Sequence, residues 1–180
     1  MILHRATFTQ NPMSFLQRRC AARTSLVAVG AFALAIGVVV YLTDRRGPLA
    51  TLASALGAST GHHLFGDLGQ WLPSFVHPFA FSLFTAAVLP RRSAWQYAGC
   101  VGWGAVNIAF EVGQHPRFSA AWAGALQTAF GSSPWVQRVA NYFTLGTFDG
   151  SDIVAAILGS LAAAAVLWLG RPRWEKVDAT

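Results

Sequence analysis

Four long apolar runs, separated by short charged or turn-forming segments, account for most of the chain. They span residues 25–43, 71–89, 94–113 and 152–169. Each has roughly the 17–25 residues that a helix needs to cross the hydrocarbon core of a bilayer. Because lipid offers the backbone no hydrogen-bond partners, a crossing segment of this kind has to be helical. The pattern predicts an all-α polytopic membrane bundle of about four transmembrane helices.

The first run follows a basic segment, as the apolar part of a signal peptide does. Its apolar core is too long for a signal peptide, and residues 39–43 offer no small-residue cleavage site. We expect an uncleaved helix and three regions: a basic cytoplasmic segment at 1–24, a transmembrane helical domain at 25–170 and a cytoplasmic tail at 171–180. A shorter apolar stretch, 49–60, is predicted to be interfacial or re-entrant.

Two features of the runs bear on how the helices pack. Pro73 and Pro78 lie inside the second run, where each removes a backbone hydrogen bond and bends the helix. Ala155, Gly159 and Ala163 recur at four-residue steps in the last run, which is typical of close helix contacts in membranes.

The longest connection, residues 114–151, is predicted to contain two helices. Residues 119–130 are apolar on most sides, and Ser133-Pro134 has the pattern of a helix start, with Ser as the cap and Pro at the first position. Apolar residues then repeat at helical spacing. We expect residues 134–145 to form an amphipathic helix that lies on the membrane or across the mouth of the bundle.

Composition agrees with the membrane class, because 54% of the residues are hydrophobic and 11% are charged, against about 25% charged in soluble domains. The net charge of +6 comes from arginines beside the apolar runs, so we expect contact with anionic lipid rather than nucleic acid. Nine of the 13 basic residues fall on the side of the termini, which predicts cytoplasmic N- and C-termini. Cys20 and Cys100 show no metal-binding spacing, and no disulfide is expected.

Acids and histidines gather on the opposite, outer side. They are Asp44, Asp67, Glu111, Asp149, Asp152, His62, His63, His77 and His115. An ionised side chain at the bilayer centre costs roughly 2.5–3.5 kcal/mol on insertion scales, so we expect such groups to turn inward to water and to one another. The candidate binding residues, predicted to converge in one polar cavity between the last three crossing helices, are His77, Glu111, Gln114, Asp149 and Asp152.

These candidates also have purely structural alternatives. Glu111 could instead pair with Arg117 or Arg138. Asp152 is well placed to cap the last helix, and His77 could bond a carbonyl freed by the proline kink. A zinc site from Glu111 and the histidines is a further alternative that lacks an HExxH motif. We expect no metal and no cofactor.

Three short motifs follow the order of the predicted helices. A His lies early in one membrane helix, Glu-x-x-Gln ends the next, and Asp-x-x-Asp precedes a final helix rich in small residues. The residues are His77, Glu111, Gln114, Asp149, Asp152, Ala155 and Gly159. Over residues 71–169 the chain thus resembles the VanZ-like family. The resemblance implies a small multi-spanning protein of the bacterial inner membrane, and the founding member of the family is associated with resistance to the glycopeptide teicoplanin.

The chain departs from that family at polar positions. Pro73-Ser74-Phe75 stands where a charged pair is usual, Gly146-Thr147 where an Arg is usual, and Ala156 where an Asn is usual. The linker after Gln114 is also long. These differences bear on a shared activity more than on a shared fold.

Three function classes follow from the sequence. The first is a VanZ-like envelope protein, non-enzymatic or with a cryptic activity, that acts at the outer leaflet or on cell-wall precursors. The second is an accessory subunit of a larger membrane complex, with the long linker as its docking surface. The third is a lipid- or sugar-modifying enzyme whose catalytic candidates are His77, Glu111, Asp149 and Asp152. The partners expected are membrane lipids and other membrane-protein subunits.

Overall fold

A computed structural model describes residues 12–43, 65–90 and 93–170, and this part of the chain is helical without strands. Its helices are α1 (Pro12–Thr43), α3 (Leu68–Val88), α4 (Ser93–Gln114), α5 (Ser119–Phe130), α6 (Pro134–Leu145) and α7 (Gly150–Leu169). The prediction of an all-α protein is confirmed. The stretch 49–60 and the two ends of the chain lie outside the described residues.

Three helices in the described ranges are long and apolar enough to cross a membrane: Cys20–Thr43 of α1, α3 and α7. Helix α4 has 22 residues, about 33 Å at 1.5 Å per residue, so its length suffices. Its polar side chains, among them Asn107, Glu111 and Gln114, make it less apolar than these three segments. Helices stand at all four predicted crossings, and the crossing by α4 stays a prediction.

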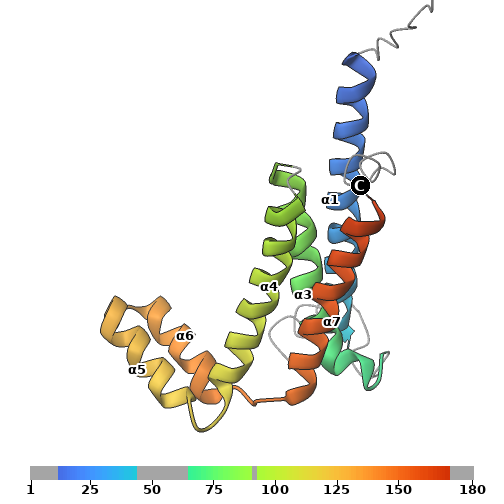
Figure 1. The fold of residues 1–180 in the computed structure, drawn as a ribbon. Helices are drawn as coiled ribbons and strands as arrows, with labels where there is room; N and C mark the ends of the chain where they lie inside the picture. The colour runs from blue at the N-terminus through green and yellow to red at the C-terminus, as the bar shows by residue number, and fades with distance from the viewer. Residues whose placement is uncertain (1–11, 44–64, 91–92, 171–180) are drawn as a thin grey trace, which may run out of the picture.

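Helix α3 packs against α1, α4 and α7 (Figure 1), and these four packed helices are called the bundle below. The C-terminal part of α3 joins a core in which Leu83 and Ala86 pack with Cys100 of α4 and with Ala163 and Leu167 of α7. In a membrane, lipid is as apolar as these side chains, so close packing is the interaction that holds the helices together.

Small residues allow α7 to approach α3 closely. Ala155, Gly159 and Ala163 are all buried, which confirms the predicted packing face. A Cβ atom at Gly159 would collide with the backbone carbonyl of Phe75, so the two helix backbones lie nearly in contact. This approach occurs beside Pro78 of α3, which is buried.

Helices α5 and α6 form a hairpin that extends sideways from the end of α4 (Figure 1). Val136, Ala140 and Phe143 are the buried residues of α6, and the Phe143 ring contacts Trp122 of α5 and Phe110 of α4. Both predicted linker helices are therefore confirmed. The hairpin lies beside the bundle, and both of its helices contact α4.

The start of α6 forms at the predicted residues but without the predicted hydrogen bond. Pro134 is the first helical residue, and Ser133 holds the extended backbone of a cap residue. Its side chain makes no capping hydrogen bond, and its buried Oγ has no partner within the described ranges. The proline, which has no N–H to satisfy, is thus enough to mark the helix start.

Candidate functional site

A cavity of about 720 Å³ lies at one end of the bundle, where α1 and α4 end and α3 and α7 begin. Figure 1 shows these helix ends together at the lower end of the bundle. The five residues predicted to converge all line this cavity: His77 from α3, Glu111 and Gln114 from α4, Asp149 before α7 and Asp152 within it. The alternating direction of the helices brings them to the same level.

The helical repeat selects which side chains face the cavity. Asn107, Glu111 and Gln114 of α4 are four and three residues apart, so they share one face of the helix. Pro73 and His77 of α3 are also four apart and line the cavity together. The polar side of each helix end is thereby turned toward the interior.

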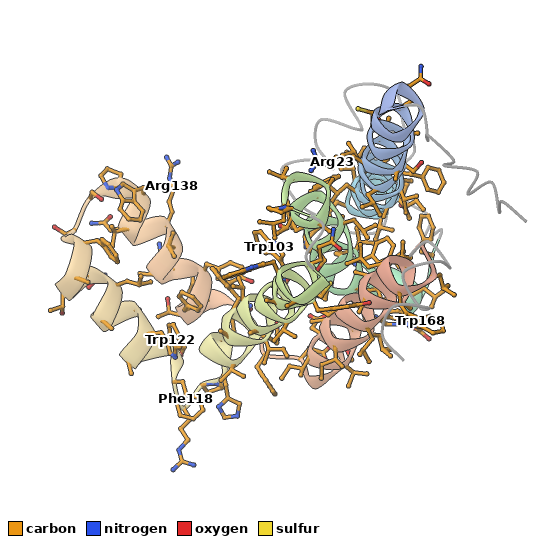
Figure 2. All side chains as sticks on the ribbon, turned by 45° about the horizontal axis from the view of Figure 1, so that its top comes forward. Arg23, Trp103, Phe118, Trp122, Arg138 and Trp168 are labelled. Carbon is orange, nitrogen blue, oxygen red and sulfur yellow. The ribbon has the colours of Figure 1, made fainter. Side chains whose placement is uncertain are left out.

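Glu111 is the most buried acid of the described residues, with 9% of its surface exposed. Its Oε1 accepts a hydrogen bond of 2.6 Å from the backbone N–H of Asp149. This bond joins the end of α4 to the residue that precedes α7. Arg138, a proposed partner of Glu111, lies on the α5–α6 hairpin away from the bundle (Figure 2).

Asp149, and not Asp152, caps α7. Its Oδ1 accepts a hydrogen bond of 2.8 Å from the backbone N–H of Ser151, and the helix begins at Gly150. The prediction that Asp152 caps this helix is wrong, because the helix starts earlier and leaves Asp152 in the first turn. The bonds from Ser151 hold the pKa of the Asp149 carboxyl below its usual value.

Asp152 lacks the hydrogen bond that an acid in the first turn of a helix often accepts from the cap residue. In a capping box the acid three residues after the cap accepts a bond from the cap's own N–H. Here Glu111 already occupies the N–H of Asp149. The Oδ1 atom of Asp152 is buried and has no hydrogen-bond partner among the described residues, although the dipole of α7 favours a negative charge at this position.

Tyr142 joins the same network from the end of α6. Its hydroxyl oxygen accepts a hydrogen bond of 2.8 Å from Nε2 of Gln114. Burial raises the pKa of the Tyr142 phenol, and the negative charges of Glu111 and Asp152 raise it further. The phenol therefore stays neutral, and its O–H can donate a hydrogen bond to a ligand.

Several lining residues were not among the predicted ones. They include Tyr41 at the end of α1, Asn107 on α4 and Tyr142. Asn107 could have been found from its shared face with Glu111, four residues on. The two tyrosines carried no such signal, because their place depends on how α1 and α6 meet the other helix ends.

The histidines do not form a metal centre in the described part of the chain. His77 lines the cavity, and its ring stacks on Phe81 with centroids 6.2 Å apart. His115 instead packs edge-on against Phe148, with centroids 4.9 Å apart. Within the described ranges no three His, Cys, Asp or Glu side chains are grouped to hold a metal ion, and His62 and His63 lie outside those ranges.

The charge of the cavity wall is one-sided. Three carboxylates line it, from Glu111, Asp149 and Asp152, and no Lys or Arg of the described residues does. Comparison of the chain with protein-family models, with curated proteins and with solved structures finds no match. The chemistry of the cavity is therefore the basis on which a function can be argued.

Proposed function

We propose that this is a multi-pass protein of the bacterial inner membrane in which α4 crosses beside α1, α3 and α7. Support comes from the distribution of side chains around α4. Glu111 and Gln114 are buried at the cavity, whereas Val101 and Val106 are exposed on its surface. A helix with its polar side chains turned inward and apolar ones outward suits a lipid environment.

In this proposal both termini are cytoplasmic and the cavity opens toward the outer surface, as the basic residues predict. The test is labelling of single engineered cysteines by a membrane-impermeant reagent on intact cells. Cysteines at Gly66 and Ser132 should react, and one at Ser93 should react only after the membrane is opened. The reverse pattern would overturn the orientation.

The proposed activity is the binding of a polar ligand by a VanZ-like envelope protein, with teicoplanin-type resistance as its outcome in the cell. One observation carries the proposal: polar residues from separate helices converge on a single cavity of about 720 Å³. Cavities of roughly 300–1,000 Å³ with a few convergent polar groups are the usual form of small-molecule sites. Binding rather than catalysis is favoured, because Glu111 and Asp149 are each already engaged with a backbone N–H.

The experiment is expression of the chain in a teicoplanin-susceptible bacterium, with the minimum inhibitory concentration as the readout. The intact protein should raise that concentration, and Glu111→Gln should abolish the rise at equal expression. Asp67→Asn is the matched control, since Asp67 is exposed and does not line the cavity. No rise with well-expressed intact protein, or an unchanged rise with Glu111→Gln, would refute the proposal.

An accessory role in a larger membrane complex is the second candidate, favoured by the surface of the α5–α6 hairpin. Trp122, Phe130, Trp135 and Leu145 are all exposed there, and Figure 2 shows Trp122 on α5. Purification in mild detergent tests this role: a second protein present in equal amount would support it, and a protein that purifies alone would exclude it.

A further inference from the structure

We propose that the cavity takes an organic ammonium group, such as the amine of a lipid headgroup or of an amino sugar. This inference rests on the proposed function, because it names the ligand class of the same cavity. The observations behind it are the charge of the wall, the state of Asp152 and the aromatic rings around the carboxylates.

The negative charge of the described cavity wall favours a cationic ligand. Glu111 is nine-tenths buried and Asp152 has one buried carboxylate oxygen. A buried ionised carboxylate is costly unless a cation or several donors compensate it. No Lys or Arg of the described residues lines the cavity, so the described wall offers no cation to the buried oxygen of Asp152.

The hydrogen bonds indicate that a cationic ligand would bind at Asp152. Oε1 of Glu111 is held by the Asp149 amide, and Oδ1 of Asp149 by the Ser151 amide. Oδ1 of Asp152 is buried and unpartnered among the described residues. An ammonium N–H donor placed against Asp152 would supply the missing hydrogen bond and at the same time lie in the field of Glu111.

The aromatic rings favour an organic cation over a metal ion. Tyr41, Phe110 and Tyr142 line the cavity, and the rings of Phe110 and Tyr142 meet edge to face with centroids 5.8 Å apart. Aromatic faces attract alkylammonium groups. A metal ion would instead need several protein ligands at one point, and no such group exists in the described ranges.

The cavity is also larger than a single small cation requires. Its volume of about 720 Å³ has room for the group that carries the amine. The same ammonium chemistry could come from a phospholipid headgroup that enters from the membrane or from a free amine that enters from water. The experiment below separates these two sources.

The test uses the full chain in mild detergent and follows its thermal unfolding with matched probes. Ethanolamine is compared with ethylene glycol, which has the same size but no charge, at an ionic strength held equal with sodium chloride. In a second arm, phosphatidylethanolamine is compared with phosphatidylglycerol in the micelles. Stabilisation by ethanolamine indicates a free amine, and stabilisation by phosphatidylethanolamine alone indicates a lipid headgroup. Either result supports the proposal, and equal effects within both pairs overturn it.

Variants identify the site. Asp152→Asn should weaken binding of the effective amine roughly tenfold, through the loss of one charge-assisted hydrogen bond. Glu111→Gln should also weaken it, through the loss of a nearby negative charge. Asp67→Asn removes the same charge outside the cavity and should bind as the intact protein does. Equal binding by all the variants would overturn the site. If Asp152→Asn fails to fold, Glu111→Gln and the two pairs of probes on the intact protein still test the proposed site.

The resistance assay keeps this inference separate from the proposed function. Suppose that the protein raises the inhibitory concentration through Glu111 but is stabilised equally by ethanolamine and ethylene glycol, and equally by phosphatidylethanolamine and phosphatidylglycerol. The proposed function would then stand, and the proposed ammonium ligand would be refuted. A protein that binds the amines through Asp152 but confers no resistance would retain the ligand class and lose the role in resistance.

Discussion

Replacement of Gly159 by alanine should test whether close contact between α3 and α7 holds the cavity end of the bundle together. An added Cβ would collide with the carbonyl oxygen of Phe75 and lie 3.2 Å from Cγ of Pro78. Neither neighbour can rotate away, because one is helix backbone and the other is a proline ring. Helix α7 must therefore move outward from α3.

The expected cost follows from a comparison with Gly102, whose added Cβ would meet no atom within 4 Å. Both glycines lie inside helices, so Gly→Ala brings the same propensity gain of roughly 0.8–1 kcal/mol at each position. The overpacking at Gly159 costs about 1–3 kcal/mol. Gly159→Ala should therefore be less stable than Gly102→Ala by about that overpacking energy.

The assay is unfolding of both variants in mixed micelles with increasing SDS, followed by circular dichroism. The cavity should change as well, since Ala156 and Asp152, which line it, lie one and two turns before Gly159. The reasoning is refuted if Gly159→Ala is at least as stable as Gly102→Ala and still binds the cavity's ligand.

Three further predictions concern the network at the cavity and can be measured in the same unfolding assay. Glu111→Ala leaves the Asp149 amide without its acceptor and should cost roughly 1.5–3 kcal/mol, whereas Glu111→Gln keeps an acceptor oxygen and should cost clearly less; equal losses would contradict the bond. Asp149→Ala removes the cap of α7 and should cost about 1 kcal/mol at neutral pH. Because the pKa of Asp149 is lowered, the stability that its carboxylate contributes is present above the ordinary pKa of 3.8 and is lost as the pH falls through the pKa of the folded protein. If Asp149→Ala remained less stable than the intact protein below the pKa of the folded protein, the capping role would be contradicted. Tyr142→Phe removes the acceptor of Gln114 and should cost about 1 kcal/mol. Since the pKa of Tyr142 is raised above 10.0, the stability that its neutral form contributes should decline only as the pH rises past that value, and an earlier decline would show a different environment.

The sequence by itself determined where the helices lie and five of the residues that line the cavity. Run length and lack of charge are local properties, so they located α1, α3, α4 and α7 without knowledge of the packing. The predicted convergence of His77, Glu111, Gln114, Asp149 and Asp152 is found in the structure. It follows from chain direction, because successive long helices reverse direction and bring alternate helix ends to the same level.

Only the tertiary structure decided how these residues are connected. The structure places the cap of α7 at Asp149 and not at the predicted Asp152. Glu111 takes the N–H that would otherwise bind Asp152, and this bond joins residues 38 positions apart. Tyr142 reaches Gln114 only because the α5–α6 hairpin folds back against the end of α4. Hydrophobic periodicity specifies which face of a helix is apolar, but the partner of a polar group is set by whichever distant segment packs beside it.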